Sequence, residues 1–282
     1  MHEAVAAIGK KLSPGGAFLS SVRLPIGEVE DRNCFVTGLV LRETATLPEC
    51  PTLKELRRKA SAFLLRSQYP SHPYSFAFYP LRSHPFWMQQ ALYADADDTS
   101  VIALELVRAG HWPAEVLTRI IEQYLFRYRA IGDLRHHRKA VWQPEGVFLT
   151  WFSTACRENP IDCCVNTNVV ALLAVAGLAA HESYTAACVM INAAAQMTVA
   201  QPSRLRAFTP YYPHPVEWFY ALDHAVQVGA CELLPAREAI GSLQQVQESL
   251  FSTVPLCSDA VGNIVWTAEV ITLARRLRHQ AN

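Results

Sequence analysis

Three of the chain's eight aspartates, Asp95, Asp97 and Asp98, lie within four positions in the segment YADADDTS. Only 18% of the residues are charged, so this crowding is unusual for the composition. A carboxyl group that is crowded by other carboxylates or surrounded by apolar groups keeps its proton above the pKa of about 3.9 that free aspartate has. The cluster could therefore hold a neutral aspartic acid near pH 7, as a general acid requires.

A plain helix start is the alternative interpretation of these aspartates. The apolar run VIALELV follows them directly, and Asp, Thr and Ser are all favoured at the first positions of a helix. A helix N-terminus stabilises carboxylates as anions and lowers their pKa. The two interpretations thus predict opposite pKa shifts, and the residues alone leave both open.

Helical patterns dominate the rest of the chain. They cover 51–68, 112–132, 181–197, 214–229, 235–251 and 262–279. The exception is CFVTGLVLRET, residues 34–44, for which the β-branched residues predict a short strand or hairpin.

One pattern recurs along the chain. Residues 97–110, 165–178 and 261–274 each have a polar pair before an apolar helix. Such helix–turn–helix units pack into stacked hairpins, and helices that are apolar all round belong to the inside of the stack. We therefore predict an all-α fold, one domain over residues 1–282, built as an α/α toroid. Its inner helices are expected to begin near Thr99, Thr167 and Asn263.

The segment DADDTS before an apolar helix resembles the DxDDTA motif of class II terpene cyclases, such as squalene–hopene cyclase and class II diterpene cyclases. Ser100 stands where the motif has alanine, and the chain has room for one toroid where these enzymes use two. The resemblance implies proton-initiated cyclisation or isomerisation of an isoprenoid or similar polyene. It implies that Asp97 is the general acid, that Asp98 hydrogen-bonds to Asp97, and that Asp95 tunes or anchors the site.

A pocket for such chemistry needs aromatic walls, because aromatic faces stabilise cations and exclude water. Aromatic residues are dense in the loops that lead into the proposed inner helices. In a toroid the equivalent helix starts surround one mouth, so polar residues of the second start should face the aspartates. The expected substrate-binding residues are Tyr79, Trp87, Tyr93, Trp151, Asn166, Asn168, Tyr211, Tyr212 and Trp218.

Bulk properties limit the partners. The 25 basic and 25 acidic residues cancel, which gives no indication of a nucleic-acid partner. The longest uncharged apolar run, 169–180, is shorter than the roughly 20 residues of a membrane span, and no secretory signal is recognised, so we expect a cytoplasmic protein.

The eight cysteines form no CxxC pair, and the metal-binding DDxxD sequence is missing, so we expect no metal and no cofactor. The expected ligand is a small hydrophobic molecule, and a homodimer could supply a further wall.

Two other classes of function remain open. A glycan hydrolase or lyase with the same toroid would need a second carboxylate, for which Glu145 and Glu217 are available, and a polar groove. A binding module without catalysis could keep the toroid and use the aspartates as a helix cap.

Overall fold

The computed structural model describes residues 2–88, 90–156 and 158–281. The helices are α1 (His2–Gly9), α2 (Cys34–Thr44), α3 (Pro51–Arg66), α4 (Ala96–Arg108), α5 (Glu115–Ile120), α6 (Cys163–Val175), α7 (Glu182–Ala200), α8 (Leu205–Phe208), α9 (Pro215–Gln227), α10 (Leu234–Gly241), α11 (Gln244–Ser249) and α12 (Glu269–Ala281). The strands are β1 (Leu19–Leu24), β2 (Gly27–Arg32), β3 (Pro255–Ser258) and β4 (Val265–Thr267).

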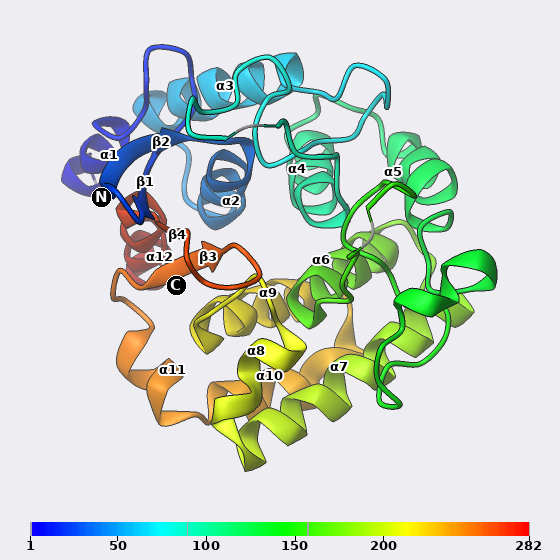
Figure 1. Ribbon diagram of the computed structural model, residues 1–282. Coiled ribbons are helices and arrows are strands. Elements are labelled where there is room, and N and C mark those ends of the chain that lie inside the picture. The colour runs from blue at the N-terminus through cyan, green and yellow to red at the C-terminus, as the bar shows by residue number, and fades with distance from the viewer. Residues whose placement is uncertain (1, 89, 157, 282) are drawn as a thin grey trace.

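The helices are arranged in a ring. Helices α2, α4, α6 and α9 pack against one another in this order, and α12 packs on α2 (Figure 1). The outer helices α3, α7 and α10 each pack on the inner helix that precedes them in the sequence. Ion pairs join α9 to α12, with 2.7 Å between Glu217 and Arg275 and 3.7 Å between Asp223 and Arg278. These contacts complete the ring.

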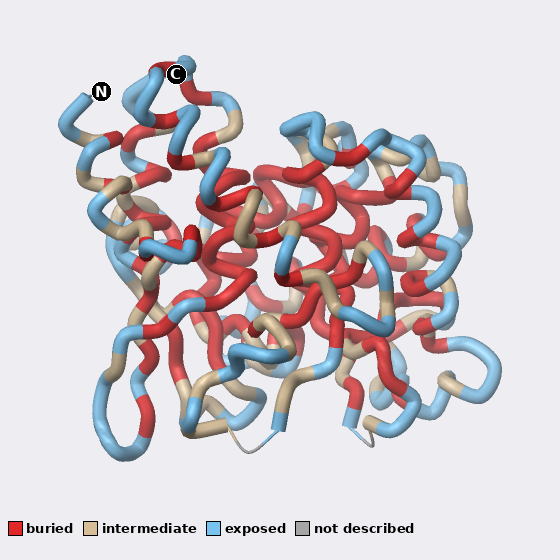
Figure 2. The backbone as a smooth tube through the Cα atoms, turned by 90° about the horizontal axis from the view of Figure 1, so that it is seen from above, coloured by how far each residue is buried: buried red, intermediate tan, exposed pale blue. Residues whose placement is uncertain are grey.

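Burial distinguishes the inner helices from the outer ones. Every residue of α2 is buried, and so are residues 163–173 of α6. In α3 the buried residues Leu53, Leu56, Ala60 and Leu64 follow one face at helical spacing. The buried backbone accordingly gathers in the middle of the molecule in Figure 2, with exposed segments around it. Two of the three predicted inner helices, those near Thr99 and Thr167, are α4 and α6, which begin three and four residues earlier than expected.

Residues 34–44 form helix α2, so the predicted strand is wrong. Asn33 caps this helix by accepting a hydrogen bond from the Val36 backbone N–H at 2.7 Å. Burial on all sides explains the error, because a buried helix and a buried strand both appear as an apolar run. The Gly38 backbone lies so close to α4 that a Cβ there would be 2.7 Å from the Ile102 side chain.

A four-stranded antiparallel sheet, in the order β2-β1-β4-β3, makes the fold helix-rich but not all-α. The β1–β2 hairpin turns at Pro25 and Ile26, and Gly27 follows with a φ of +134°, which favours glycine. Asn263 lies in the turn between β3 and β4, and the helix predicted to begin there begins at Glu269. The apolar residues Val265 and Trp266 are therefore strand residues. Among the described helices, no apolar stretch is long enough to cross a bilayer.

Candidate active site

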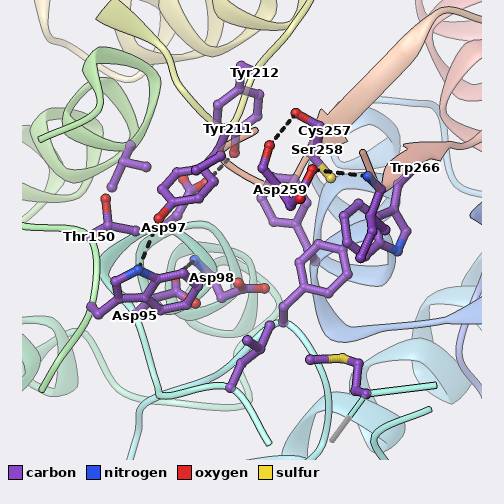
Figure 3. A pocket seen from close by; sticks show the side chains of 18 of the residues that line it. Asp95, Asp97, Asp98, Thr150, Tyr211, Tyr212, Cys257, Ser258, Asp259 and Trp266 are labelled. Carbon is purple, nitrogen blue, oxygen red and sulfur yellow. Dashed lines mark hydrogen bonds between the residues drawn. The ribbon is translucent and has the colours of Figure 1, made fainter. Parts of the chain in front are cut away.

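A pocket of about 410 Å³ lies between the N-terminal ends of α4 and α6 and the β3–β4 hairpin. In Figure 3 the three aspartates, Tyr211 and Tyr212 lie on one side of the pocket, and Cys257 and Trp266 lie on the other. Its apolar and aromatic lining consists of Phe35, Phe78, Trp87, Met88, Leu92, Trp151, Val165, Tyr211, Tyr212, Cys257, Ala260, Ile264 and Trp266. The polar lining consists of Asp95, Asp97, Asp98, Thr150, Ser258 and Asp259.

The start of α4 positions the aspartate cluster. Asp95 is the N-cap of the helix, and its Oδ1 accepts a hydrogen bond from the Asp98 backbone N–H at 2.8 Å. The Asp95 backbone N–H donates to the Phe76 carbonyl oxygen at 2.9 Å, and the Asp95 backbone forms an isolated antiparallel β-bridge with Trp151. These contacts hold the first turn of α4, with Asp97 and Asp98, against the pocket.

The Asp97 carboxyl group has a donor on each oxygen. The Asn168 amide nitrogen donates to Oδ1 at 2.7 Å, and the Tyr212 hydroxyl group donates to Oδ2. Both partners come from elsewhere in the ring, since Asn168 is on α6 and Tyr212 lies in the turn before α9. The family resemblance implies Asp98 as the partner of Asp97, whereas the hydrogen bonds of the Asp97 carboxyl group come from these two residues.

Burial raises the pKa of all three aspartates. The pKa of Asp97 is raised because the group is desolvated, although the hydrogen bonds from Tyr212 and Asn168 and the positive charge of Arg42 act in the opposite direction. Desolvation, together with the negative charge of Asp97, raises the pKa of Asp95 to about 7. In Asp95 and Asp97 the effect of desolvation therefore outweighs the lowering of the pKa that a helix N-terminus gives an exposed cap.

Asp98 differs from Asp97 in its partners. Desolvation and the negative charge of Asp95 raise the pKa of Asp98 well above its usual value, and the protonated group hydrogen-bonds to the Asp95 carboxylate. Its Oδ1 is buried and has no hydrogen-bond partner in the described part of the chain. A carboxylate formed at Asp98 would therefore lack donors, which makes Asp98 a weaker acid than Asp97.

The start of α6 holds the two tyrosines in place. Asp162 is the N-cap of this helix, and its Oδ1 accepts hydrogen bonds from the backbone N–H groups of Cys164 at 2.7 Å and Val165 at 3.1 Å. Its Oδ2 accepts from the Tyr211 backbone N–H at 3.1 Å. Asp162 thus ties the 211–212 turn to α6, so that the Tyr212 hydroxyl group reaches Asp97.

The expected substrate-binding residues fall into two groups. Trp87, Trp151, Tyr211 and Tyr212 line the pocket, and Asn168 contacts it through Asp97. The other four lie outside the lining. Tyr79 hydrogen-bonds to Asp31, and Tyr93 is exposed. Asn166 hydrogen-bonds to the Phe148 backbone, and Trp218 is buried against Thr167.

Several pocket residues were not expected from the sequence. Phe35 is on α2, and Cys257, Ser258, Asp259, Ala260, Ile264 and Trp266 are on the β3–β4 hairpin. The sequence predicts a strand for the segment of Phe35 and a helix for the segment of Ile264 and Trp266, so these patterns do not indicate that the three residues line the pocket. Arg42, whose Nη1 donates to Asn168 Oδ1 at 3.4 Å, was also missed, because nothing in its local sequence indicates a contact with α6.

The carboxylates required by the glycan-enzyme alternative lie elsewhere. Glu145 is exposed, and its nearest cation is Arg138 at 3.9 Å. Glu217 is buried and binds Arg275 through two hydrogen bonds of 2.8 and 2.7 Å. Neither residue lines the pocket, so neither can act with Asp97 on one glycosidic bond.

No protein-family model matches the sequence, and no curated protein matches it. Solved structures do match. The type II terpene cyclase MstE from Scytonema, as a variant in complex with the product merosterolic acid A, is 14% identical with a TM-score of 0.50, over 98% of this chain and 94% of the other. The apo form of MstE is 16% identical with a TM-score of 0.49, over 99% and 96%. Another MstE variant, bound to the substrate geranylgeranyl dihydroxybenzoate, is 14% identical with a TM-score of 0.46, over 98% and 94%. The likeness to the first of these shows that the chain has a terpene cyclase-like fold.

Proposed function

We propose that this protein is a proton-initiated cyclase or isomerase of the class II type, acting on an isoprenoid or similar polyene with Asp97 as general acid. The observation that carries the proposal is the Asp97 carboxyl group, which is buried beside an aromatic pocket and has a hydrogen-bond donor on each oxygen. The ring of helices is then a single α/α toroid over residues 1–282, with the acid at the start of an inner helix.

The reaction begins with proton transfer. The O–H bond of Asp97 breaks, and the π electrons of a terminal alkene form a new C–H bond at one carbon, which leaves a carbocation at the other. A second double bond of the same substrate attacks this cation and closes a ring, and loss of a proton from the final cation ends the reaction. Asn168 and Tyr212 stabilise the Asp97 carboxylate as it forms, which makes Asp97 a stronger acid in the transition state.

The pocket wall suits a cationic intermediate. Phe35, Phe78, Trp87, Trp151 and Trp266 present aromatic groups to the cavity. Aromatic faces attract cations, and a lining that excludes water protects the intermediate from hydration. The same wall fits a hydrophobic chain better than a sugar, which needs many polar partners.

The charge of the lining also bears on the substrate class. Four of the described lining residues, Asp95, Asp97, Asp98 and Asp259, have carboxyl groups, and none of the described lining residues is Lys, Arg or His. A diphosphate in this pocket would meet acidic groups without a cation to bind it. We therefore infer a substrate that reaches the pocket as a neutral polyene.

The decisive experiment incubates the purified protein with neutral polyprenyl substrates in deuterated water and an excess of chelator. One deuterium should appear at the initiating carbon of the cyclised product. Asp97→Asn keeps the size of the side chain but removes the transferable proton, so turnover should fall below detection. The matched control is Asp133→Asn, the same change at an exposed aspartate, which should leave turnover unchanged.

Two outcomes would contradict the mechanism. Near-native turnover by Asp97→Asn would exclude Asp97 as the acid, and conversion of a polyprenyl diphosphate that needs added magnesium would indicate ionisation of the diphosphate instead of protonation. Failure to convert any polyene would favour a different toroid enzyme or a binding module.

A further inference from the structure

A line of buried polar side chains connects Asp97 to the centre of the ring. The Asn168 amide nitrogen donates to Asp97 Oδ1 at 2.7 Å, and Arg42 Nη1 donates to the Asn168 amide oxygen at 3.4 Å. Arg42 also pairs with Glu43 through Nη2 at 3.2 Å. All four side chains are more than nine-tenths buried, so these contacts form away from solvent.

The guanidinium group of Arg42 determines how the Asn168 amide is oriented. An amide group has an acceptor oxygen on one side and a donor nitrogen on the other, whereas a guanidinium group has donors only. The side of the amide that faces Arg42 must therefore be the oxygen. The nitrogen is left facing Asp97, and it can only donate to Asp97 Oδ1.

We propose that Arg42 is a positioning residue that, through Asn168, confines the acidic proton of Asp97 to Oδ2. The inference rests on the proposed function, because it assigns the oxygen from which that reaction takes its proton. Oδ1 accepts from Asn168 and serves as the carbonyl oxygen of the neutral acid. Oδ2 carries the proton and accepts a hydrogen bond from the Tyr212 hydroxyl group.

Without Arg42 the amide could turn by half a rotation about its Cβ–Cγ bond. The Asn168 oxygen would then face Asp97 and accept the acidic proton in a hydrogen bond. A proton held in this way points into the protein along the line to α6 and is withheld from the substrate. Arg42 thus acts on the direction of the proton, and it does so without touching the pocket, whose lining does not include it.

Arg42 is held in place by a partner that is firmly anionic. The positive charges of Arg42, Arg275 and Arg278 outweigh the desolvation of Glu43 and lower its pKa to about 2. Arg278 forms an ion pair with Glu43 Oε2 at 2.8 Å, and Arg275 lies 3.5 Å from Oε1. This network therefore fixes Arg42 at every pH at which the protein would work.

The ionisable groups that face Asp97 come from five segments. Tyr212 lies in the turn before α9, Asp162 and Cys164 lie at the start of α6, Arg42 lies on α2, Cys257 lies on β3, and Asp95 and Asp98 flank Asp97 itself. Arg42 is the cation of this set. Its removal should therefore raise the pKa of Asp97, while the other groups remain as they are.

The test compares Arg42→Gln with Arg278→Gln, which removes another arginine from the Glu43 network but has no contact with Asn168. The first measurement is infrared difference spectroscopy of the substrate-free protein, with Asp97→Asn as the reference that identifies the C=O band of protonated Asp97. In Arg42→Gln this band should change its frequency, because the proton moves to Oδ1 and donates to the Asn168 amide oxygen, while Oδ2 becomes the carbonyl oxygen and accepts from Tyr212. The band should not move in Arg278→Gln.

Turnover provides the second measurement. In Arg42→Gln, kcat should fall about 100-fold, within the usual contribution of a positioned general acid, while KM changes little. The alkaline limb of the kcat profile should move up by roughly one pH unit as the nearby charge is lost. Arg42→Lys also offers donors only, and it should restore the infrared band and part of kcat.

A double-mutant cycle keeps the inference testable if Arg42→Gln folds poorly. Asn168→Leu removes the amide, so Arg42→Lys in that background should not change kcat by more than about threefold. An unmoved infrared band in Arg42→Gln, or equal effects of Arg42→Gln and Arg278→Gln, would overturn the inference. If no polyene is converted, the proposed function fails, but the infrared band still decides where the Asp97 proton lies.

Discussion

Asp97 has to satisfy two opposing requirements. It must hold a proton near neutral pH, which burial supports by raising its pKa, and it must release that proton to a weakly basic alkene. Donors to the carboxyl group meet the second requirement, because they stabilise the anion that remains. Asp98 meets only the first, since its Oδ1 has no donor among the described residues. The difference between the two adjacent aspartates is therefore one of hydrogen bonding.

Tyr212→Phe tests the contribution of one hydrogen-bond donor to the acidity of Asp97. The change removes the hydroxyl group that donates to Asp97 Oδ2 and leaves the aromatic ring in the pocket wall. A hydrogen bond to a charged group contributes about 1.5–3 kcal/mol, so kcat should fall about 10–100-fold. Steady-state kinetics on the polyene substrate would measure the change.

The matched control for this change is Tyr211→Phe, which also removes a pocket hydroxyl group, but one that accepts a hydrogen bond from Trp151 Nε1 at 3.1 Å. It should lower kcat less than Tyr212→Phe. Equal effects of the two changes would show that the hydroxyl group of Tyr212 has no special part in the proton transfer.

The two helix starts that meet at the pocket each place a buried carboxylate at the N-cap position. Asp95 caps α4 and Asp162 caps α6, and in both cases desolvation raises the pKa to about 7 in spite of hydrogen bonds from backbone N–H groups. Ordinary N-caps lie at the surface and remain anionic. Because these caps are buried, the N-terminal backbone N–H groups of both helices lie close to the acid, and this burial lowers the free energy of unfolding.

This cost depends on pH, and Asp162→Asn should reveal it. Between pH about 4 and 7 the folded protein holds a proton on Asp162 that the unfolded chain has already lost. Raising the pH through this window therefore lowers the free energy of unfolding. Asparagine keeps the capping oxygen but does not titrate, so the variant should lose less stability than the natural protein between pH 5 and pH 8.

Urea unfolding at the two pH values measures the difference. Asp133→Asn serves as the control, because that side chain is exposed, and it should keep the full pH dependence. Glu43 does not interfere, since its lowered pKa confines its effect to pH values below about 4.5. An Asp162→Asn protein with an unchanged pH dependence would contradict the argument.

The molecule as a whole is a ring of helices, with the pocket at one end and buried ion pairs at the other. The first and last inner helices are far apart in the sequence, and α12 reaches both α2 and α9. Arg275 of α12 binds Glu217 of α9 and lies 3.7 Å from the centre of the Tyr220 ring. These contacts belong to the closure of the ring and not to the pocket.

Glu217→Gln tests how much the closure contributes to stability. Loss of one partner of a buried ion pair costs about 3–5 kcal/mol, because the other charge is left uncompensated. The change should lower the midpoint of thermal unfolding clearly. Glu269→Gln, on α12, breaks an exposed pair with Lys11, and it should cost less than about 1 kcal/mol.

Calorimetry of both variants provides the comparison. Because Glu217 lies outside the pocket lining, any variant protein that remains folded should keep its kcat. A loss of kcat without a loss of stability would instead place Glu217 in the chemistry and would revive the carboxylate-pair mechanism.

The local sequence by itself was enough to place the aspartates at the start of a buried helix, to identify most of the helices and to predict an aromatic pocket beside the acid. Capping preferences and apolar periodicity are set by residues a few positions apart, so they can be recognised in the chain. The partners of the acid could not be identified in this way. Helix α6 is buried on nearly every side, so no amphipathic pattern distinguishes Asn168, which reaches Asp97, from Asn166, which binds the Phe148 backbone. Tyr212 contacts the acid across 115 residues of sequence, and Arg42 contacts Asn168 across 126. The β3–β4 hairpin completes the pocket only because β4 pairs with β1 near the other end of the chain. Tertiary packing alone decided these contacts, because they depend on how the ring closes.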